Sequence, residues 1–178
     1  MRIALAALCL ALALPAAAAR GAGAQAHVEV AFTPGDDIEG LIVRSIERAR
    51  SSVHVQAYLF TDRHVAGALV GALRRGVAVE LIGDAAQQEA GGLPLLGSLQ
   101  RAGARIYLND QLAASHNKIV IVDAQTPSAT VITGSYNLTH AAQSRNAENV
   151  VLISGNRAIT DRYLRNFVLH RSQSKSWP

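Results

Sequence analysis

Short apolar runs alternate with amphipathic segments along residues 27–178, and this alternation limits the possible folds more than any other feature of the sequence. Two runs, residues 53–60 and 77–82, have strand length, while residues 36–50 carry apolar side chains at helical spacing. The expected strands are residues 28–32, 53–60, 77–82, 105–108, 118–122, 130–133 and 150–153, with helices in 36–50, 62–75, 95–101 and 159–167. Alternating helices and buried strands, with back-to-back strands in the second half, predict a single-domain α/β fold, an α-β-α sandwich with a mixed central β-sheet.

The first 26 residues have the pattern of a cleaved secretory signal. A short positive start is followed by an apolar run from Ile3 to Leu14 and then by small residues ending in two A-x-A sites. The run is short for a permanent membrane helix, so an uncleaved anchor is the less favoured alternative. We therefore expect a signal peptide over 1–26, a catalytic domain over 27–178, and a bacterial protein that is periplasmic or secreted, with no stable membrane insertion after cleavage.

Loss of the signal changes the composition of the expected mature chain. The only cysteine, Cys9, is removed, which excludes disulfides, thiolate nucleophiles and cysteine-bound metals. Arg2 and Arg20 leave without any acidic residue, so the net charge falls from +4 to +2. This charge permits a polyanionic partner without requiring one.

The chemistry is expected to lie between Ser115 and Asn149. His116 and Lys118 stand two residues apart at the start of an apolar strand that runs to Asp123. Residues two apart in a strand point to the same side, so we expect the imidazole and the ammonium to project together at the end of the sheet. This pair suits an anionic phosphoryl group, because one side chain can attack phosphorus while the other neutralises charge.

The residues after the next strand can reach the same edge. Ser135 and Asn137 can donate hydrogen bonds to phosphate oxygens, and Gly134 permits close approach of the backbone. Glu148 precedes the following strand, where its carboxylate can accept a proton from the second nitrogen of the His116 imidazole.

The pattern of His116, Lys118 and Asp123, followed by Gly134-Ser135-x-Asn137 and Glu148-Asn149, resembles the HKD motif of the phospholipase D superfamily. A single motif in one domain is most similar to its small endonucleases. The resemblance implies that His116 is the nucleophile that forms a phosphohistidine.

The same resemblance implies roles for the companions of His116. Lys118, Ser135 and Asn137 match phosphate-binding positions, and Glu148 matches the carboxylate that orients the imidazole. Asp123 matches the third letter of the motif, either as a catalytic residue or as a support for the local fold.

One histidine cannot attack phosphorus and protonate the leaving oxygen in the same step, so a single motif predicts a homodimer with a shared site. No ligand spacing in the sequence suggests a metal site, and we expect no metal and no cofactor. The arginines in the expected helices have the pattern of solvated helix faces, with a nucleic-acid groove as the alternative.

The expected function is sequence-non-specific hydrolysis of nucleic acid, DNA first and RNA as an alternative. Hydrolysis of phosphatidyl head groups is the rival enzyme activity; it requires an exposed apolar docking surface, and the sequence predicts none. A third hypothesis is an inactive nucleic-acid-binding domain of the same fold, against which the intact set of site residues argues.

Overall fold

A computed structural model describes residues 26–178 of the 178-residue chain. Its strands are β1 His27–Thr33, β2 Ser52–Ala57, β3 Ala78–Asp84, β4 Arg105–Asn109, β5 Lys118–Val122, β6 Thr130–Gly134, β7 Glu148–Ser154 and β8 Lys175–Ser176. Its helices are α1 Ile38–Glu47, α2 Arg63–Arg74, α3 Ala85–Gln87, the π-helical turn η1 Gln88–Gly92, α4 Leu93–Arg101, α5 His140–Ser144 and α6 Arg157–Ser172. Apart from Ala26, the expected signal lies outside the described residues.

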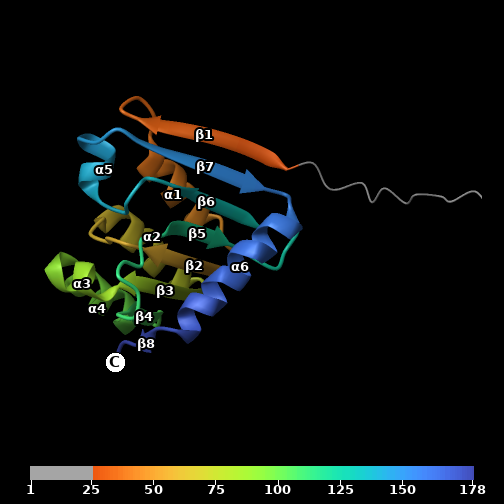
Figure 1. Ribbon diagram of the computed structural model, residues 1–178. Coiled ribbons are helices and arrows are strands. Elements are labelled where there is room, and N and C mark those ends of the chain that lie inside the picture. The colour runs from red at the N-terminus through yellow and green to blue at the C-terminus, as the bar shows by residue number, and fades with distance from the viewer. Residues whose placement is uncertain (1–25) are drawn as a thin grey trace, which may run out of the picture.

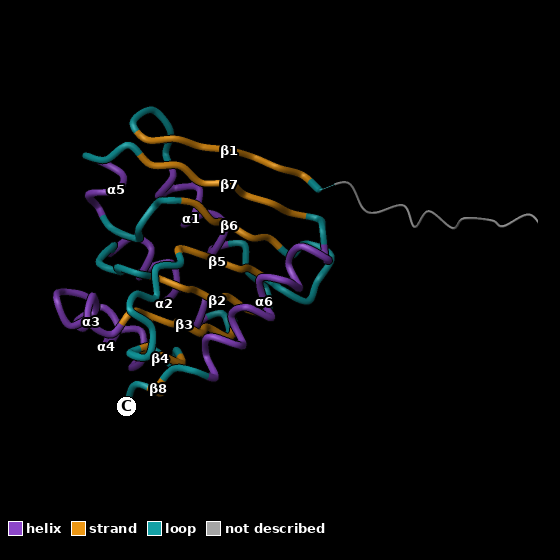
Figure 2. The backbone as a smooth tube through the Cα atoms, viewed as in Figure 1, coloured by secondary structure: helices purple, strands orange, loops and turns teal. Residues whose placement is uncertain are grey.

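The strands form one sheet in the order β1-β7-β6-β5-β2-β3-β4-β8, and they run side by side in Figure 2. β2, β3 and β4 are parallel, whereas every other pairing is antiparallel. The predicted α-β-α sandwich with a mixed sheet is therefore confirmed. β8 pairs with β4 and Trp177 packs on the core, so the residues after α6 extend the sheet.

Helices cover both faces of the sheet, with α1, α2 and α4 on one face and α6 on the other (Figure 1). β5 shows how the sequence makes this possible. Val120 and Val122 join the cluster under α1 and α2, while Ile119 and Ile121 pack with Phe167 of α6. A strand buried on both faces must be apolar at every position, which explains the continuous run in the sequence.

Polar side chains cap the N-termini of the long helices α2 and α6. Asp62 Oδ1 accepts hydrogen bonds from the backbone N–H groups of His64 (2.8 Å) and Val65 (3.0 Å) and so caps the start of α2. Asn156 caps α6 in the same way. Among residues 26–178, none of the helices combines the length and apolar character needed to cross a membrane.

Candidate active site

The register of the sheet brings the ends of four strands to one edge. Lys118 at the start of β5 pairs with Ala57 at the end of β2, and Ile119 pairs with Thr133 near the end of β6. Gly134 then pairs with Val150 near the start of β7. The segments that carry His116, Ser135 and Glu148 therefore meet at the end of the sheet where α5 lies (Figure 1).

His116 and Lys118 lie together, as the alternation of the strand predicts. The ammonium Nζ of Lys118 is 3.2 Å from His116 Nδ1 and donates a 2.8 Å hydrogen bond to the His116 carbonyl oxygen. The imidazole is exposed and Lys118 is half-buried. Burial lowers the pKa of Lys118, and the negative charge of Glu148 opposes this shift, which shows that the carboxylate acts on the same site.

Tyr58 is a site residue that pattern reasoning missed. Its ring centroid is 4.3 Å from that of His116, and Lys118 Nζ lies 4.8 Å from the centre of the same ring. Its backbone N–H donates to the carbonyl of Asn117, between the two basic residues. The aromatic face therefore holds the imidazole and ammonium against each other. The only sign of this role in the sequence was the position of Tyr58 just after β2.

Asp84 fixes the loop that leads to His116. One carboxylate oxygen accepts from the backbone N–H of Ser115 at 2.8 Å, and the other caps α3 through Gln87 at 3.1 Å. Asp84 is buried at the end of β3. The exposed imidazole thus follows a residue whose backbone is anchored to the sheet, which limits the positions His116 can take.

The polar half of the site is formed by Ser135 and Glu148. The Ser135 hydroxyl donates to Glu148 Oε2 at 2.5 Å and accepts from the backbone N–H of Asn149 at 3.0 Å. The other oxygen, Oε1, accepts from Asn146 at 2.9 Å. Within the described chain, Glu148 makes no hydrogen bond with His116, so the expected contact between carboxylate and imidazole is absent from the single subunit.

Gly134 and Asn137 lie on the same segment as Ser135. A Cβ on Gly134 would lie 2.1 Å from the carbonyl oxygen of Asn149, so glycine is required for the close approach of β6 and β7. Asn137 is half-buried on the same segment, and its Oδ1 has no hydrogen-bond partner among the described residues. This buried oxygen can only accept a hydrogen bond, so it does not test the expected donation from the Asn137 amide to phosphate.

Asp123 lies far from the other predicted site residues. It lies at the far end of β5, roughly 16 Å of strand from Lys118 at about 3.3 Å per residue. Its carboxylate accepts from the backbone N–H groups of Arg50, Ser51 and Ser52, at 2.7 to 3.1 Å, and from the Ser51 hydroxyl. The position supports the second sequence alternative: Asp123 ties the end of β5 to the start of β2.

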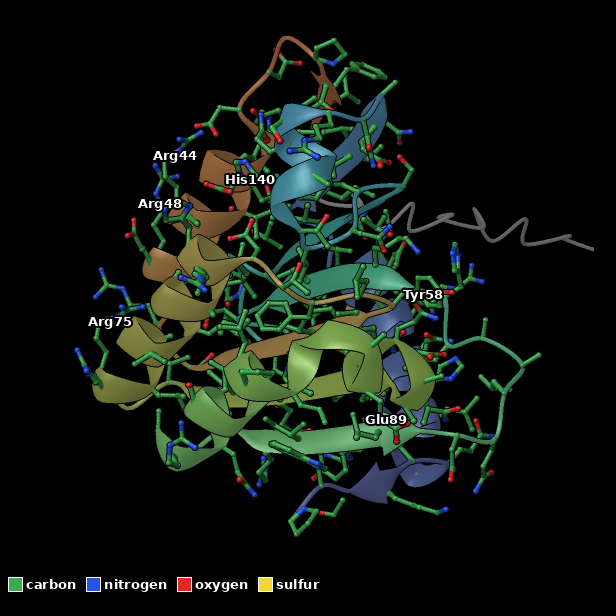
Figure 3. All side chains as sticks on the ribbon, turned by 90° about the vertical axis from the view of Figure 1, so that its left-hand side faces the viewer. Arg44, Arg48, Tyr58, Arg75, Glu89 and His140 are labelled. Carbon is green, nitrogen blue, oxygen red and sulfur yellow. The ribbon has the colours of Figure 1, made fainter. Side chains whose placement is uncertain are left out.

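The arginines of the helical face lie away from the site. Figure 3 shows Arg44, Arg48 and Arg75 on the opposite side of the molecule from Tyr58. This arrangement agrees with solvated helix faces for these three residues. The one group of three metal-ligand side chains found in the described part of the chain, Glu39, Asp62 and His64, does not include His116.

Three comparisons extend these observations. The family model described as cardiolipin synthase, PLD-like domain, matches residues 42–170. A phospholipase D of Rickettsia prowazekii is 34% identical over 151 residues, which cover 85% of this chain and 71% of that protein. Nuc from Salmonella typhimurium, a phospholipase D family member of solved structure, superposes with a TM-score of 0.80 at 27% identity, covering 86% of this chain and 99% of Nuc. NucT from Helicobacter pylori shares the fold, with a TM-score of 0.76 at 19% identity over 86% of this chain and 100% of NucT.

The fold and these matches define a hydrolase of phosphodiester bonds. More specifically, the chain belongs to the phospholipase D superfamily, as a single PLD-like domain.

Replacement of Tyr58 tests its positioning role. Tyr58→Ala removes the ring under both basic groups, worth about 1 kcal/mol, and should lower kcat/KM about fivefold. Tyr58→Phe keeps the ring and should stay within about twofold of wild type. The measurement is steady-state hydrolysis of a chromogenic phosphodiester; equal losses in both variants would assign the effect to the hydroxyl instead.

Replacement of Asp123 tests whether the residue is structural. Asp123→Ala leaves three backbone N–H groups without their acceptor and should lower the free energy of unfolding by about 3 kcal/mol in urea titrations. Below the denaturation temperature, kcat/KM should change little. A large loss of kcat/KM at unchanged stability would show instead that Asp123 takes part in catalysis.

The same residue gives a pH dependence. Burial acts to raise the pKa of Asp123, but hydrogen bonds from Ser51, Ser52 and Arg50 outweigh it and hold the pKa below its usual value. A lowered pKa in the folded state stabilises the protein above about pH 4, and this contribution is lost as the pH falls through the folded-state pKa. Asp123→Asn should therefore flatten the fall in stability below about pH 4, as measured by urea titrations at a series of pH values.

Proposed function

We propose that the protein is an endonuclease that hydrolyses DNA, with RNA as a second substrate, through a covalent phosphohistidine on His116. The observation that carries this proposal is the exposed imidazole held beside Lys118 and the Tyr58 ring, next to the carboxylate of Glu148. An ammonium at this place stabilises the negative charge that develops on the phosphoryl oxygens. We further propose that no metal takes part in the reaction.

The tautomer of His116 supports a shared site. When Lys118 donates to Nδ1, the proton of the neutral ring sits on Nε2, so Nε2 has no free lone pair with which to attack phosphorus. A nucleophilic Nε2 needs a carboxylate on Nδ1, and within residues 26–178 no carboxylate hydrogen-bonds this ring. In the proposed homodimer a second subunit supplies this carboxylate, and the two His116 residues divide the roles of nucleophile and acid.

The edge strand β1 offers a surface for the second subunit. Val28, Val30 and Phe32 are 55%, 56% and 56% exposed and alternate, so they share one face of the strand. Phe32 pairs with Asn149, whose side-chain amide donates to the Ser135 hydroxyl. A partner that covers this stripe would therefore also reach the site.

The same stripe corrects the expectation that the chain has no exposed apolar docking surface, because Phe32 and both valines are exposed. This observation favours a second candidate function, hydrolysis of phosphatidyl head groups at a lipid surface. The name phospholipase D carried by the Rickettsia relative supports the same alternative. The similarity to Nuc over 99% of that chain, together with the resemblance to small single-domain endonucleases, supports the nuclease.

Parallel assays distinguish the candidates. Plasmid DNA, RNA, and vesicles of phosphatidylcholine or cardiolipin are incubated with wild type, His116→Ala and the matched control His140→Ala, all in excess EDTA. We expect wild type and His140→Ala to cleave DNA, and His116→Ala to lose at least about 10³-fold in rate, because the nucleophile is gone.

The other possible assay results would support a different function. Head-group release without DNA cleavage would replace the nuclease by the lipid hydrolase, and DNA binding without turnover in wild type would favour an inactive binding domain. Loss of cleavage in EDTA that magnesium restores, with the Tm unchanged, would contradict the metal-independent reaction.

A further inference from the structure

Three side chains with metal-binding atoms meet where α1 and α2 begin. Glu39 lies in the first turn of α1, Asp62 caps α2, and His64 lies in the first turn of α2. His64 Nδ1 is 2.8 Å from Glu39 Oε1, and one ligand atom from each residue lies within 4.8 Å of the others. Glu39 is 23 residues from Asp62 in the sequence, so ligand spacing alone gave no sign of the group.

Two buried oxygens at this place lack partners. Asp62 is only 2% exposed; its Oδ1 caps α2, whereas Oδ2 has no hydrogen bond among the described residues. The Tyr136 hydroxyl, also buried, has no partner in the same part of the chain. Buried polar atoms are rarely left unpaired, because each costs free energy comparable to a lost hydrogen bond. Of these two oxygens, Asp62 Oδ2 belongs to the group of three, and it points either to a bound cation or to a proton shared with Glu39.

Two carboxylates and one imidazole meet at this place. Burial raises the pKa of Glu39, the neighbouring Asp62 raises it further, and His64 opposes the shift. Burial, and after it the negative charges of Asp62, Glu39, Asp37 and Glu148, raise the pKa of Tyr136. Two carboxylates this close are stabilised either by a shared proton or by a cation.

We infer that Glu39, Asp62 and His64 form a binding site for a divalent transition-metal ion of the zinc class. The ligands are Glu39 Oε1, Asp62 Oδ2 and His64 Nδ1, with a water in the fourth position. Ligands at 2.0–2.1 Å from a tetrahedral ion are roughly 3.3 Å apart, so the group closes with a small rotation of the exposed His64 side chain. One imidazole with two carboxylates favours zinc over magnesium or calcium, which prefer oxygen ligands alone.

The position of the site gives the ion a structural role. The backbone N–H groups of Thr61 and Asp62 donate to the Leu138 carbonyl oxygen at 2.9 and 3.0 Å. Leu138 follows the segment that carries Ser135 and Asn137, and Tyr136 lies within that segment. The ion therefore joins α1 and α2 behind the phosphate-binding segment and does not touch the reacting atoms.

Zinc titration of the full chain tests the inference independently of catalysis. All variants carry His116→Ala, which removes the active-site imidazole as a competing ligand. The metal-stripped parent should bind one Zn²⁺ per chain by calorimetry, with Tm rising as the zinc concentration increases. Adding His64→Ala or Asp62→Asn should weaken binding at least about tenfold. Asparagine is as good an N-cap as aspartate, so the helix start is retained.

Two controls keep the result specific. Adding His140→Ala should leave zinc binding unchanged, and magnesium should not compete at equal concentration. Absence of zinc binding by the parent, the result expected of a shared proton alone, would overturn the inference. Equal zinc affinity of the parent and the His64→Ala and Asp62→Asn variants would overturn it as well.

Discussion

The antiparallel pairing of β5 with β2 is the constraint on which the site depends. β2 begins the parallel half of the sheet, and β5 begins the antiparallel half. Because β5 runs opposite to β2, its first residue lies beside the last residues of β2, which brings Lys118 and His116 against Tyr58. The next two antiparallel strands then return Ser135 and Glu148 to the same edge. A parallel β5 would place its basic pair at the other end of the sheet.

The residues of the HKD motif lie at opposite ends of β5, in different surroundings. At one end, an exposed imidazole and a half-buried ammonium are open to an anionic substrate. At the other, the Asp123 carboxylate accepts four backbone or hydroxyl donors from Arg50, Ser51 and Ser52 and fixes the register of the strand. The HKD pattern therefore places His116 and Lys118 at the edge of the sheet that is open to a ligand. Asp123, which supports the fold, lies about one strand length away.

Much of this arrangement could be predicted from the sequence, because it follows from periodicity. The continuous apolar run of β5 predicted a buried strand, and the positions of Ser135 and Glu148 at strand ends predicted a common edge. What could not be predicted depends on side-chain contacts between distant segments. Tyr58 reads as part of a strand, and nothing in the sequence shows that its ring lies under His116. The partners of Glu148 and the exposed face of Phe32 likewise depend on which neighbours the fold supplies.

The central claim is that two copies of His116 act in one site. Co-expression of wild-type and His116→Ala chains, with the active dimer isolated and its mass measured by light scattering, tests this directly. If each site needs both imidazoles, DNA cleavage per chain falls as the square of the wild-type fraction. A linear fall, or full activity from a species with the mass of a single chain, would contradict the shared site.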